Sequence, residues 1–169
     1  MSSIYPAETE AHIQSIEELF WEYLQWANGQ LDEHYGFTAD IEAMQAEAMQ
    51  NLDKFMPPGG RIMLAEVDGA VAGIGCLKQL SPEIGEIKRM YVRPAFRRLG
   101  LGRLLLEGLL EEGRAIGYES IRLDSTRFMT AAHTLYRSYG FRDIDPYPES
   151  EIPPDMQQYW LFMEARLGE

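Results

Sequence analysis

Two arginines and two glycines form the segment of this sequence whose residue types and spacing can do chemistry. Arg97 and Arg98 precede Gly100 and Gly102, after an alternating stretch typical of a strand and before leucines spaced for one helix face. The first N–H groups of a helix lack internal partners and lie at the positive end of its dipole, so they bind anions. The arginines add positive charge. The segment therefore predicts a cradle for a pyrophosphate.

The spacing of the glycines excludes two common phosphate-binding motifs. No Gly-x-x-x-x-Gly-Lys-Ser/Thr occurs, and Leu105 stands where a dinucleotide-binding Gly-x-Gly-x-x-Gly needs its third glycine. What remains is Arg-x-x-Gly-x-Gly between a strand and a helix. Taken alone, this pattern also fits an ordinary strand-to-helix turn with exposed arginines. A second pattern follows at 132–141, Ala-His-Thr-Leu-Tyr-Arg-Ser-Tyr-Gly-Phe, where Gly140 suits a left-handed helix end.

Together the two segments resemble the Gcn5-related N-acetyltransferases, the GNAT family. The family's acetyl-CoA signature is Gln/Arg-x-x-Gly-x-Gly/Ala, and its second landmark is Ala-x-x-Leu-Tyr-x-x-x-Gly-Phe. Both occur here in the family's order, and the resemblance covers nearly the whole chain. It implies acetyl transfer from acetyl-CoA, as cosubstrate, to a primary amine of a small molecule or peptide, by direct attack in a ternary complex.

The resemblance also implies which residues hold acetyl-CoA. In the family a central strand is bulged, and its backbone receives the pantetheine arm and polarises the thioester carbonyl. The matching positions for the arm are Met90, Tyr91 and Val92. Those for the pyrophosphate are Arg97, Arg98, Leu99, Gly100, Leu101, Gly102 and Arg103.

Two residues match catalytic positions of the family. Tyr136 corresponds to the tyrosine that protonates, or hydrogen-bonds, the departing thiolate; the alternative is an aromatic packed on an amphipathic helix. Glu86 lies at the offset of a general-base glutamate found in some members; the alternative is a solvent-facing strand residue. His133 could shuttle protons, but we expect it on the helix surface. Met129 replaces an asparagine that contacts the cofactor arm in many members, which leaves one contact in doubt.

Composition narrows the function classes. The net charge of −12 disfavours a nucleic-acid partner, and it favours a cationic acceptor or simply solubility. No apolar run is long enough to span a membrane, so no membrane partner is expected. The single Cys76 and the absence of a leader pattern favour a cytoplasmic protein, with Cys76 a small buried hydrophobe. The three histidines have no partners at metal-ligand spacing, which predicts no metal.

The patterning predicts one domain over 1–169, of the α+β class, with helices on both sides of a sheet in three layers. The resemblance adds a mixed, mostly antiparallel sheet with a central splayed strand pair. Expected helices are 8–30, 39–55, a leucine-faced helix ending at Ile116, and 130–139. Expected strands are 4–5, 61–67, 70–80, 85–92, 118–123 and 157–165, with a hairpin turn at Asp68-Gly69 and a Pro-rich loop at 145–154.

The acceptor is not fixed by these residues. In this fold the first two helices and the last loop shape its site, so the candidates are Trp26, His34, Tyr35, Phe37 and the loop 147–152. Two rival functions remain open: an acyl-CoA-binding sensor or partner module with weak catalysis, and a transferase for another acyl group. A homodimer through the last strands is a further hypothesis.

Overall fold

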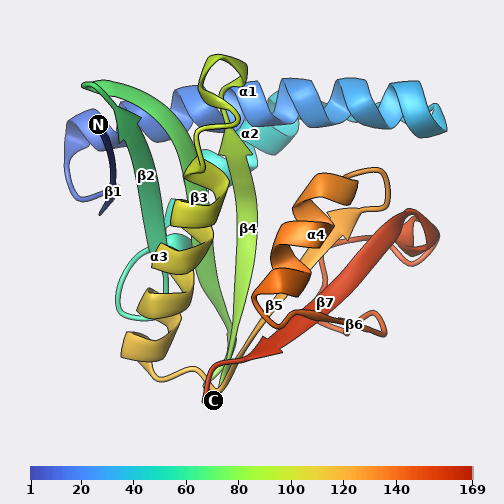
Figure 1. Ribbon diagram of the computed structural model, residues 1–169. Helices are drawn as coiled ribbons and strands as arrows, with labels where there is room; N and C mark the ends of the chain where they lie inside the picture. Colours follow the sequence, from blue (N-terminus) through green and yellow to red (C-terminus); the bar gives the residue numbers. More distant parts are fainter. Residues whose placement is uncertain (169) are drawn as a thin grey trace.

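A seven-stranded sheet runs through the molecule and divides near its middle (Figure 1). The computed structural model describes residues 1–168; Glu169, the last residue of the predicted domain, lies outside them. The strand order is β1-β2-β3-β4-β5-β7-β6, and only β4 and β5 run parallel. The strands are β1 (Ser2–Pro6), β2 (Arg61–Val67), β3 (Ala70–Ser81), β4 (Ile84–Val92), β5 (Ser120–Thr126), β6 (Arg142–Ile144) and β7 (Trp160–Arg166).

The parallel pair at the centre is joined at one end only. Ile84 to Glu86 of β4 pair with Ser120 to Arg122 of β5, and the pairing stops there. Beyond that point β4 continues to Val92 and β5 to Thr126, and Figure 1 shows the two strands spreading apart. The predicted mixed, mostly antiparallel sheet with a splayed central pair is confirmed.

Helices cover both faces of the sheet. Helix α3 (Leu101–Ile116) packs on β2, β3 and β4 from one side, and α1 (Glu10–Tyr35) packs on β3 and β4 from the other. The short helices α2 (Ile41–Gln50) and α4 (Thr130–Ser138) complete these layers, with α2 against α1 and α4 beside the second half of the sheet (Figure 1). The expectation of helices on both sides of the sheet is confirmed.

The alternation of β2 shows how the sequence builds two cores. Ile62 and Leu64 are buried with the apolar residues of α1, whereas Met63 and Ala65 are buried with the leucines of α3. Successive side chains of a strand point to opposite faces, so one strand supplies both cores. Cys76 is a free, fully buried member of the α1 core, as predicted for a small hydrophobe.

Several predicted boundaries are wrong for local reasons. Helix α1 runs five residues past the predicted end at Gln30, to Tyr35, because it continues until Gly36 caps it with φ +72°. The second helix ends at Gln50, since the Asn51 amide donates to the Glu47 carbonyl at 3.0 Å and a 3₁₀ turn, η1 (Leu52–Phe55), follows. The last strand begins at Trp160, after a 3₁₀ turn at Gln157–Tyr159.

The turn between β2 and β3 lies where the sequence predicts it, whereas β5 begins later than predicted. The β2–β3 turn falls at Asp68-Gly69, both with positive φ (49° and 86°), as the sequence predicts. Strand β5 begins at Ser120 rather than Tyr118. Tyr118 lies before it as an anchor, with its buried ring and its hydroxyl donating to the Gly59 carbonyl at 2.5 Å.

Candidate functional site

Strand β4 contains a bulge where it separates from β5. Tyr91 lies opposite Ile74 of β3, but Lys88 lies opposite Cys76, so β4 carries one extra residue in this interval. Arg89 takes up the extra residue with φ +56°, which is uncommon for a residue other than glycine. Bulges of this kind re-aim side chains next to functional sites. The predicted bulge at the start of the Met90 to Val92 segment is present.

A cavity of about 210 Å³ lies where the strands diverge. Its walls come from four sources: the bulge region of β4, the facing end of β5, the α1–α2 layer, and Tyr136 of α4. The loop before β7 closes one side. The lining of the cavity includes Lys88, Arg89, Met90, Asp124, Ser125 and Tyr136. The edge of β4 that faces this space has no strand partner after Glu86.

The predicted pyrophosphate turn lies at the N-terminus of α3. A 3₁₀ turn, η2 (Pro94–Phe96), leads out of β4, and Gly100 then caps α3 with φ +82°. Arg98 also has a positive φ, 66°. In the part of the chain that the structure describes, no backbone carbonyl accepts from the N–H groups of 98–103. The turn therefore presents a run of free donors at the positive end of a helix dipole.

The side chains of this turn do different things. The Arg97 Nε donates to the Val92 carbonyl at 2.9 Å, and its guanidinium lies over the rings of Trp26 and Tyr91. Leu101 is fully buried in the α3 core, while Leu99 is exposed. Arg98 and Arg103 form no ion pairs with residues 1–168. Arg98 and Arg103 thus leave two positive charges without an ion-pair partner at the helix start.

Tyr136 projects from α4 into the cavity wall. Gly140 follows the helix with φ +89°, and this turn packs the Phe141 ring 5.8 Å from the Tyr136 ring, as the second motif predicts. Burial raises the pKa of Tyr136 above its ordinary value. The phenol is therefore protonated at neutral pH. Tyr139, at the end of α4, bonds Glu107 of α3 instead.

His133 corrects the expectation of a histidine on the helix surface. It is 3% exposed, and its Nε2 lies 3.0 Å from the Ser125 hydroxyl of β5. Burial lowers the pKa of His133, and Arg137 acts in the same direction. Ser125 lines the cavity, so α4 is tied to the cavity wall through a neutral imidazole.

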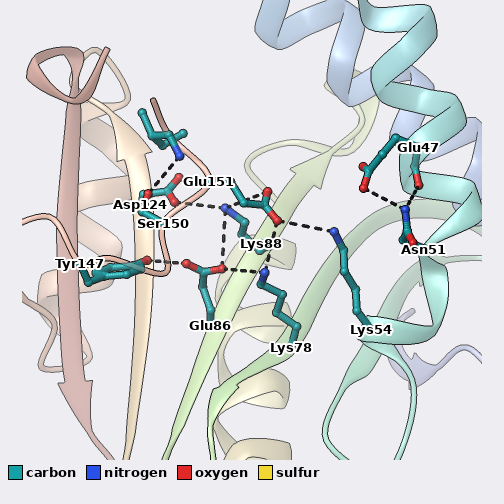
Figure 2. Close-up of polar contacts among 11 residues, drawn as sticks. Glu47, Asn51, Lys54, Lys78, Glu86, Lys88, Asp124, Tyr147, Ser150 and Glu151 are labelled. Atoms are coloured by element: carbon teal, nitrogen blue, oxygen red, sulfur yellow. Dashed lines mark hydrogen bonds and ion pairs between the residues drawn. The ribbon is translucent and has the colours of Figure 1, made fainter. Parts of the chain in front are cut away.

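Glu86 is fully buried, so the interpretation as a solvent-facing strand residue is wrong. Its Oε2 accepts from the Tyr147 hydroxyl at 2.5 Å, and its Oε1 lies 3.8 Å from the Nζ atoms of both Lys78 and Lys88. Burial raises the pKa of Glu86, against the opposing effects of Lys88 and Tyr147. Figure 2 shows Glu86 beside Lys88. Glu86 does not line the cavity itself; it contacts Lys88, which does.

Lys88 joins the two splayed strands. Its Nζ lies 3.1 Å from Asp124 of β5 and 3.7 Å from Glu151 of the loop before β7 (Figure 2). Burial lowers the pKa of Lys88, but Asp124, Glu86 and Glu151 outweigh it and raise that pKa above its ordinary value. Asp124 and Glu151 lie far from Lys88 along the chain, so no local sequence pattern predicts these two ion pairs.

Glu151 fastens the loop over the cavity. Its carboxylate lies 3.3 Å from Lys78 and 3.5 Å from Lys54, in addition to Lys88. Burial alone would raise the pKa of Glu151, but Lys88, Lys78 and Lys54 together lower it to about 2. The loop is thus held by ion pairs from Glu151 to lysines of β3, β4 and η1, which Figure 2 shows around this carboxylate.

The predicted acceptor residues fall into two groups. Trp26 lines the cavity, as does Met129 at the position of the family's asparagine. His34, Tyr35 and Phe37 lie beyond it, in an aromatic cluster in which the His34 ring stacks on Phe128 at 4.3 Å. Within the loop 147–152, Glu151 and Ile152 line the cavity, whereas Tyr147 is buried beneath it.

Comparisons with known proteins agree with this geometry. The profile of the acetyltransferase (GNAT) family matches residues 13–141. The chain is 31% identical to an uncharacterised N-acetyltransferase of Schizosaccharomyces pombe over 154 residues, which cover 89% of each protein. Among solved structures it resembles a GNAT acetyltransferase of Staphylococcus aureus Mu50, with a TM-score of 0.75, 20% identity and 99% of both chains covered. It also resembles the PaiA N-acetyltransferase of Thermoplasma acidophilum in complex with coenzyme A, with a TM-score of 0.73, 17% identity, and 98% and 99% of the chains covered.

A fold with a splayed, bulged central strand and a donor-rich turn defines a class of acyltransferases. The chain belongs to the GNAT acetyltransferase family. Its general activity is that of the family, acetyl-CoA-dependent N-acetylation. Of the helices in residues 1–168, none has the length and apolar character needed to cross a membrane.

Proposed function

We propose that this protein transfers the acetyl group of acetyl-CoA to a primary amine of a small molecule or peptide, by direct attack in a ternary complex. One observation carries the proposal. Within residues 1–168, β4 has no strand partner toward the cavity after Glu86, and the N–H groups at the start of α3, on the other side of η2, bond no backbone carbonyl; we infer that these two segments form one route for acetyl-CoA. Acetyl-CoA combines a pyrophosphate, an amide-containing arm and a thioester in that order, and the route offers donors for each.

The residues present fit acetyl-CoA. Its pyrophosphate would lie on the backbone of 98–103, with the unpaired charges of Arg98 and Arg103 beside it. Its arm would pair with the backbone at Met90, Tyr91 and Val92, which leaves the thioester next to the bulge. When bound, acetyl-CoA supplies an acyl carbon activated by a thiolate leaving group. Backbone N–H groups at the bulge would stabilise the oxyanion that develops on the acyl oxygen.

The chemistry assigns separate tasks to the two predicted catalytic residues. The amine nitrogen forms a bond to the acyl carbon with its lone pair, the C–S bond breaks, and the electron pair goes to sulfur. Tyr136, protonated and in the cavity wall, donates a proton to that sulfur. Glu86 accepts the proton that the amine loses. Because Glu86 does not line the cavity, the proton reaches it through water rather than by direct contact.

The proposal also covers location and assembly. The single cysteine is free and buried, which suits a reducing cytoplasm. Strand β6 stands at the edge of the sheet, where its outer groups can pair with a second copy. We therefore place the protein in the cytoplasm as a homodimer, and a monomeric mass by sedimentation would contradict the dimer.

Release of coenzyme A thiol in the presence of acetyl-CoA and a panel of primary amines tests the proposed function. We expect amine-dependent release, with a mass gain of one acetyl group on the acceptor. Binding of acetyl-CoA without transfer to any amine would instead identify a sensor or partner module. Faster release from a longer acyl-CoA would reassign the donor.

A further inference from the structure

The bulge of β4 brings two consecutive cations to one face of the sheet. Residues of a regular strand alternate between faces, but the extra residue breaks this alternation. Lys88 meets Glu86 and Asp124, and the next residue, Arg89, places its guanidinium 4.8 Å from the centre of the Phe20 ring of α1. Both line the cavity on the side of α1 and α2.

The two cations differ in their partners. Lys88 is neutralised by Asp124, Glu86 and Glu151. Arg89 forms no ion pair and no side-chain hydrogen bond with residues 1–168, and its Nη1 is buried without a partner. The aromatic contact with Phe20 is worth roughly 0.5–2 kcal/mol and leaves the five N–H donors of the guanidinium unused.

Four acids of α1 and the cavity wall pair with other cations. Glu18 and Glu22 of α1 pair with Arg93, at 3.6 and 3.0 Å. Asp124 and Glu151 pair with Lys88. A half-buried charge without a partner costs free energy, and such a cost in a cavity wall points to a ligand that repays it.

We propose that Arg89 binds a carboxylate of the acceptor, so that the acceptor is a small primary amine that also carries a carboxylate. The proposal rests on the proposed function. A free amino acid is the simplest member of this class. A guanidinium matches a carboxylate with two parallel hydrogen bonds, and the planar geometry fixes the acceptor's orientation as well as its position.

The position of Arg89 suits this role. It directly precedes Met90, where the backbone segment proposed for the thioester begins. A carboxylate held by Arg89 therefore keeps a nearby amine close to the acyl carbon. The cavity of about 210 Å³ is below the size typical of drug-sized ligands, which favours a small acceptor. The rest of its lining favours an apolar side chain, since it includes Leu24, Ala27, Leu31, Met44, Ile152 and Trp160.

This assignment sharpens the expectation from net charge. A charge of −12 favours a cationic acceptor through the long-range field of the whole molecule. The acceptor side of the cavity nevertheless holds one uncompensated positive charge. A polyamine would meet Arg89 with like charge, whereas an amino acid would place its own negative group there.

Steady-state coenzyme A release with matched acceptors tests the proposal. The acceptors are the standard amino acids and their carboxamides, which keep the amine and lose the negative charge. Wild type is compared with Arg89→Gln and with Arg142→Gln, a substitution of an exposed arginine on β6. Gln keeps the unbranched side chain that the positive φ at position 89 has to accommodate.

For wild type, we expect kcat/KM for the best amino acid to exceed that for its carboxamide by roughly 10–100-fold. Arg89→Gln should lower the amino acid to the level of the carboxamide and leave the carboxamide nearly unchanged. Arg142→Gln should behave as wild type. The melting temperature of Arg89→Gln should be unchanged or higher, because the substitution removes an unpaired charge; an arginine with a purely structural role would lower it.

Other outcomes overturn the proposal in distinguishable ways. Equal use of amino acids and carboxamides, or an equal loss with both in Arg89→Gln, removes the carboxylate contact and leaves the proposed function intact. The same holds if acetyl-CoA binds and other amines are acetylated while no amino acid is. If acetyl-CoA neither binds nor is consumed, the proposed function fails, and the assignment of Arg89 fails with it.

Discussion

The two sides of β4 are built in different ways. Toward α3, the proposed acetyl-CoA site uses the backbone of one short stretch, 90–103, with free N–H groups at 98–103 and the charges of Arg98 and Arg103 beside them. Toward α1 and the loop before β7, the acceptor side has a largely apolar lining and is held in place by charged side chains from η1, β3, β4, β5 and the loop (Figure 2). A local, backbone-built site can serve any acceptor, whereas a site assembled from distant side chains can be specific for one.

Removing the Tyr136 hydroxyl should give the largest effect on activity. In Tyr136→Phe, the ring still packs on Phe141, but the thiolate loses its proton donor, so kcat should fall by roughly 10²–10⁴. The KM for acetyl-CoA should change little, because the backbone holds that ligand. Tyr139→Phe, at the C-terminal end of the same helix, is the matched control and should keep kcat. An equal fall in kcat in both variants would show that the loss comes from disturbed packing of α4 and not from a missing proton donor.

Removing Lys88 should give the largest effect on stability. Lys88→Met leaves Asp124 buried without its cation and Glu86 with Lys78 alone, which costs about 3–5 kcal/mol of unfolding free energy. Lys54→Met, at the exposed edge of the same cluster, should cost less than about 1 kcal/mol. Urea unfolding measures both. Equal, small losses would mean that the acceptor side does not depend on charge pairs as we describe.

Adding a methyl group at Gly100 tests the backbone-built side. Gly100 and Gly117 cap opposite ends of α3 with φ values of +82° and +106°, so Gly100→Ala and Gly117→Ala should each cost about 1–2 kcal/mol in stability. Only Gly100→Ala disturbs the donors proposed for the pyrophosphate. Titration calorimetry should show weaker acetyl-CoA binding for Gly100→Ala alone; unchanged affinity would remove the turn from the binding site.

Removing the Glu151 carboxylate from the loop before β7 should give the smallest effect, a pH-dependent loss of stability. The pKa of Glu151 is lowered to about 2, so its stabilising contribution is present above the ordinary carboxyl pKa and is lost as pH falls through about 2. Because Glu151 is half-exposed, Glu151→Gln should cost about 1 kcal/mol or less at pH 7.

Unfolding by urea at several pH values from 7 to 2 follows this contribution. The difference between wild type and Glu151→Gln should shrink as the pH falls. Glu149 belongs to the same loop, and its carboxylate lies 4.0 Å from Arg122 of β5. Glu149→Gln is therefore the matched control and should differ little from wild type at every pH. A difference for Glu151→Gln that stays constant to pH 2 would contradict the lysine contacts.

Much of the fold follows from local sequence. The alternation of 61–67, the Asp68-Gly69 turn and the leucine face of α3 each fix an element through neighbouring residues, and each is present where expected. The misplaced boundaries share a different cause. Gly36 and Asn51 set the ends of α1 and α2 through hydrogen bonds and φ angles that hydrophobic periodicity does not report.

The residues of the candidate site also differ in whether local sequence predicts them. Gly100 and Tyr136 belong to short motifs, so the sequence predicts where they lie. The surroundings of Glu86 could not be predicted, because Tyr147 is 61 residues away along the chain. The same applies to His133, whose partner Ser125 is set by how α4 packs on β5. Arg89 differs again, since only the observed bulge reveals that it shares a face with Lys88.

Thermal unfolding with and without acetyl-CoA, with ATP as the nucleotide control, shows whether the folded protein binds acetyl-CoA. At about 100 times its dissociation constant, a ligand of the folded state adds about 2.7 kcal/mol, which for a chain of this length raises Tm by roughly 5–10 °C. We predict this rise with acetyl-CoA and none with ATP. No rise at saturating acetyl-CoA would contradict the account, because the free donors of β4 and α3 would then have no ligand to explain them.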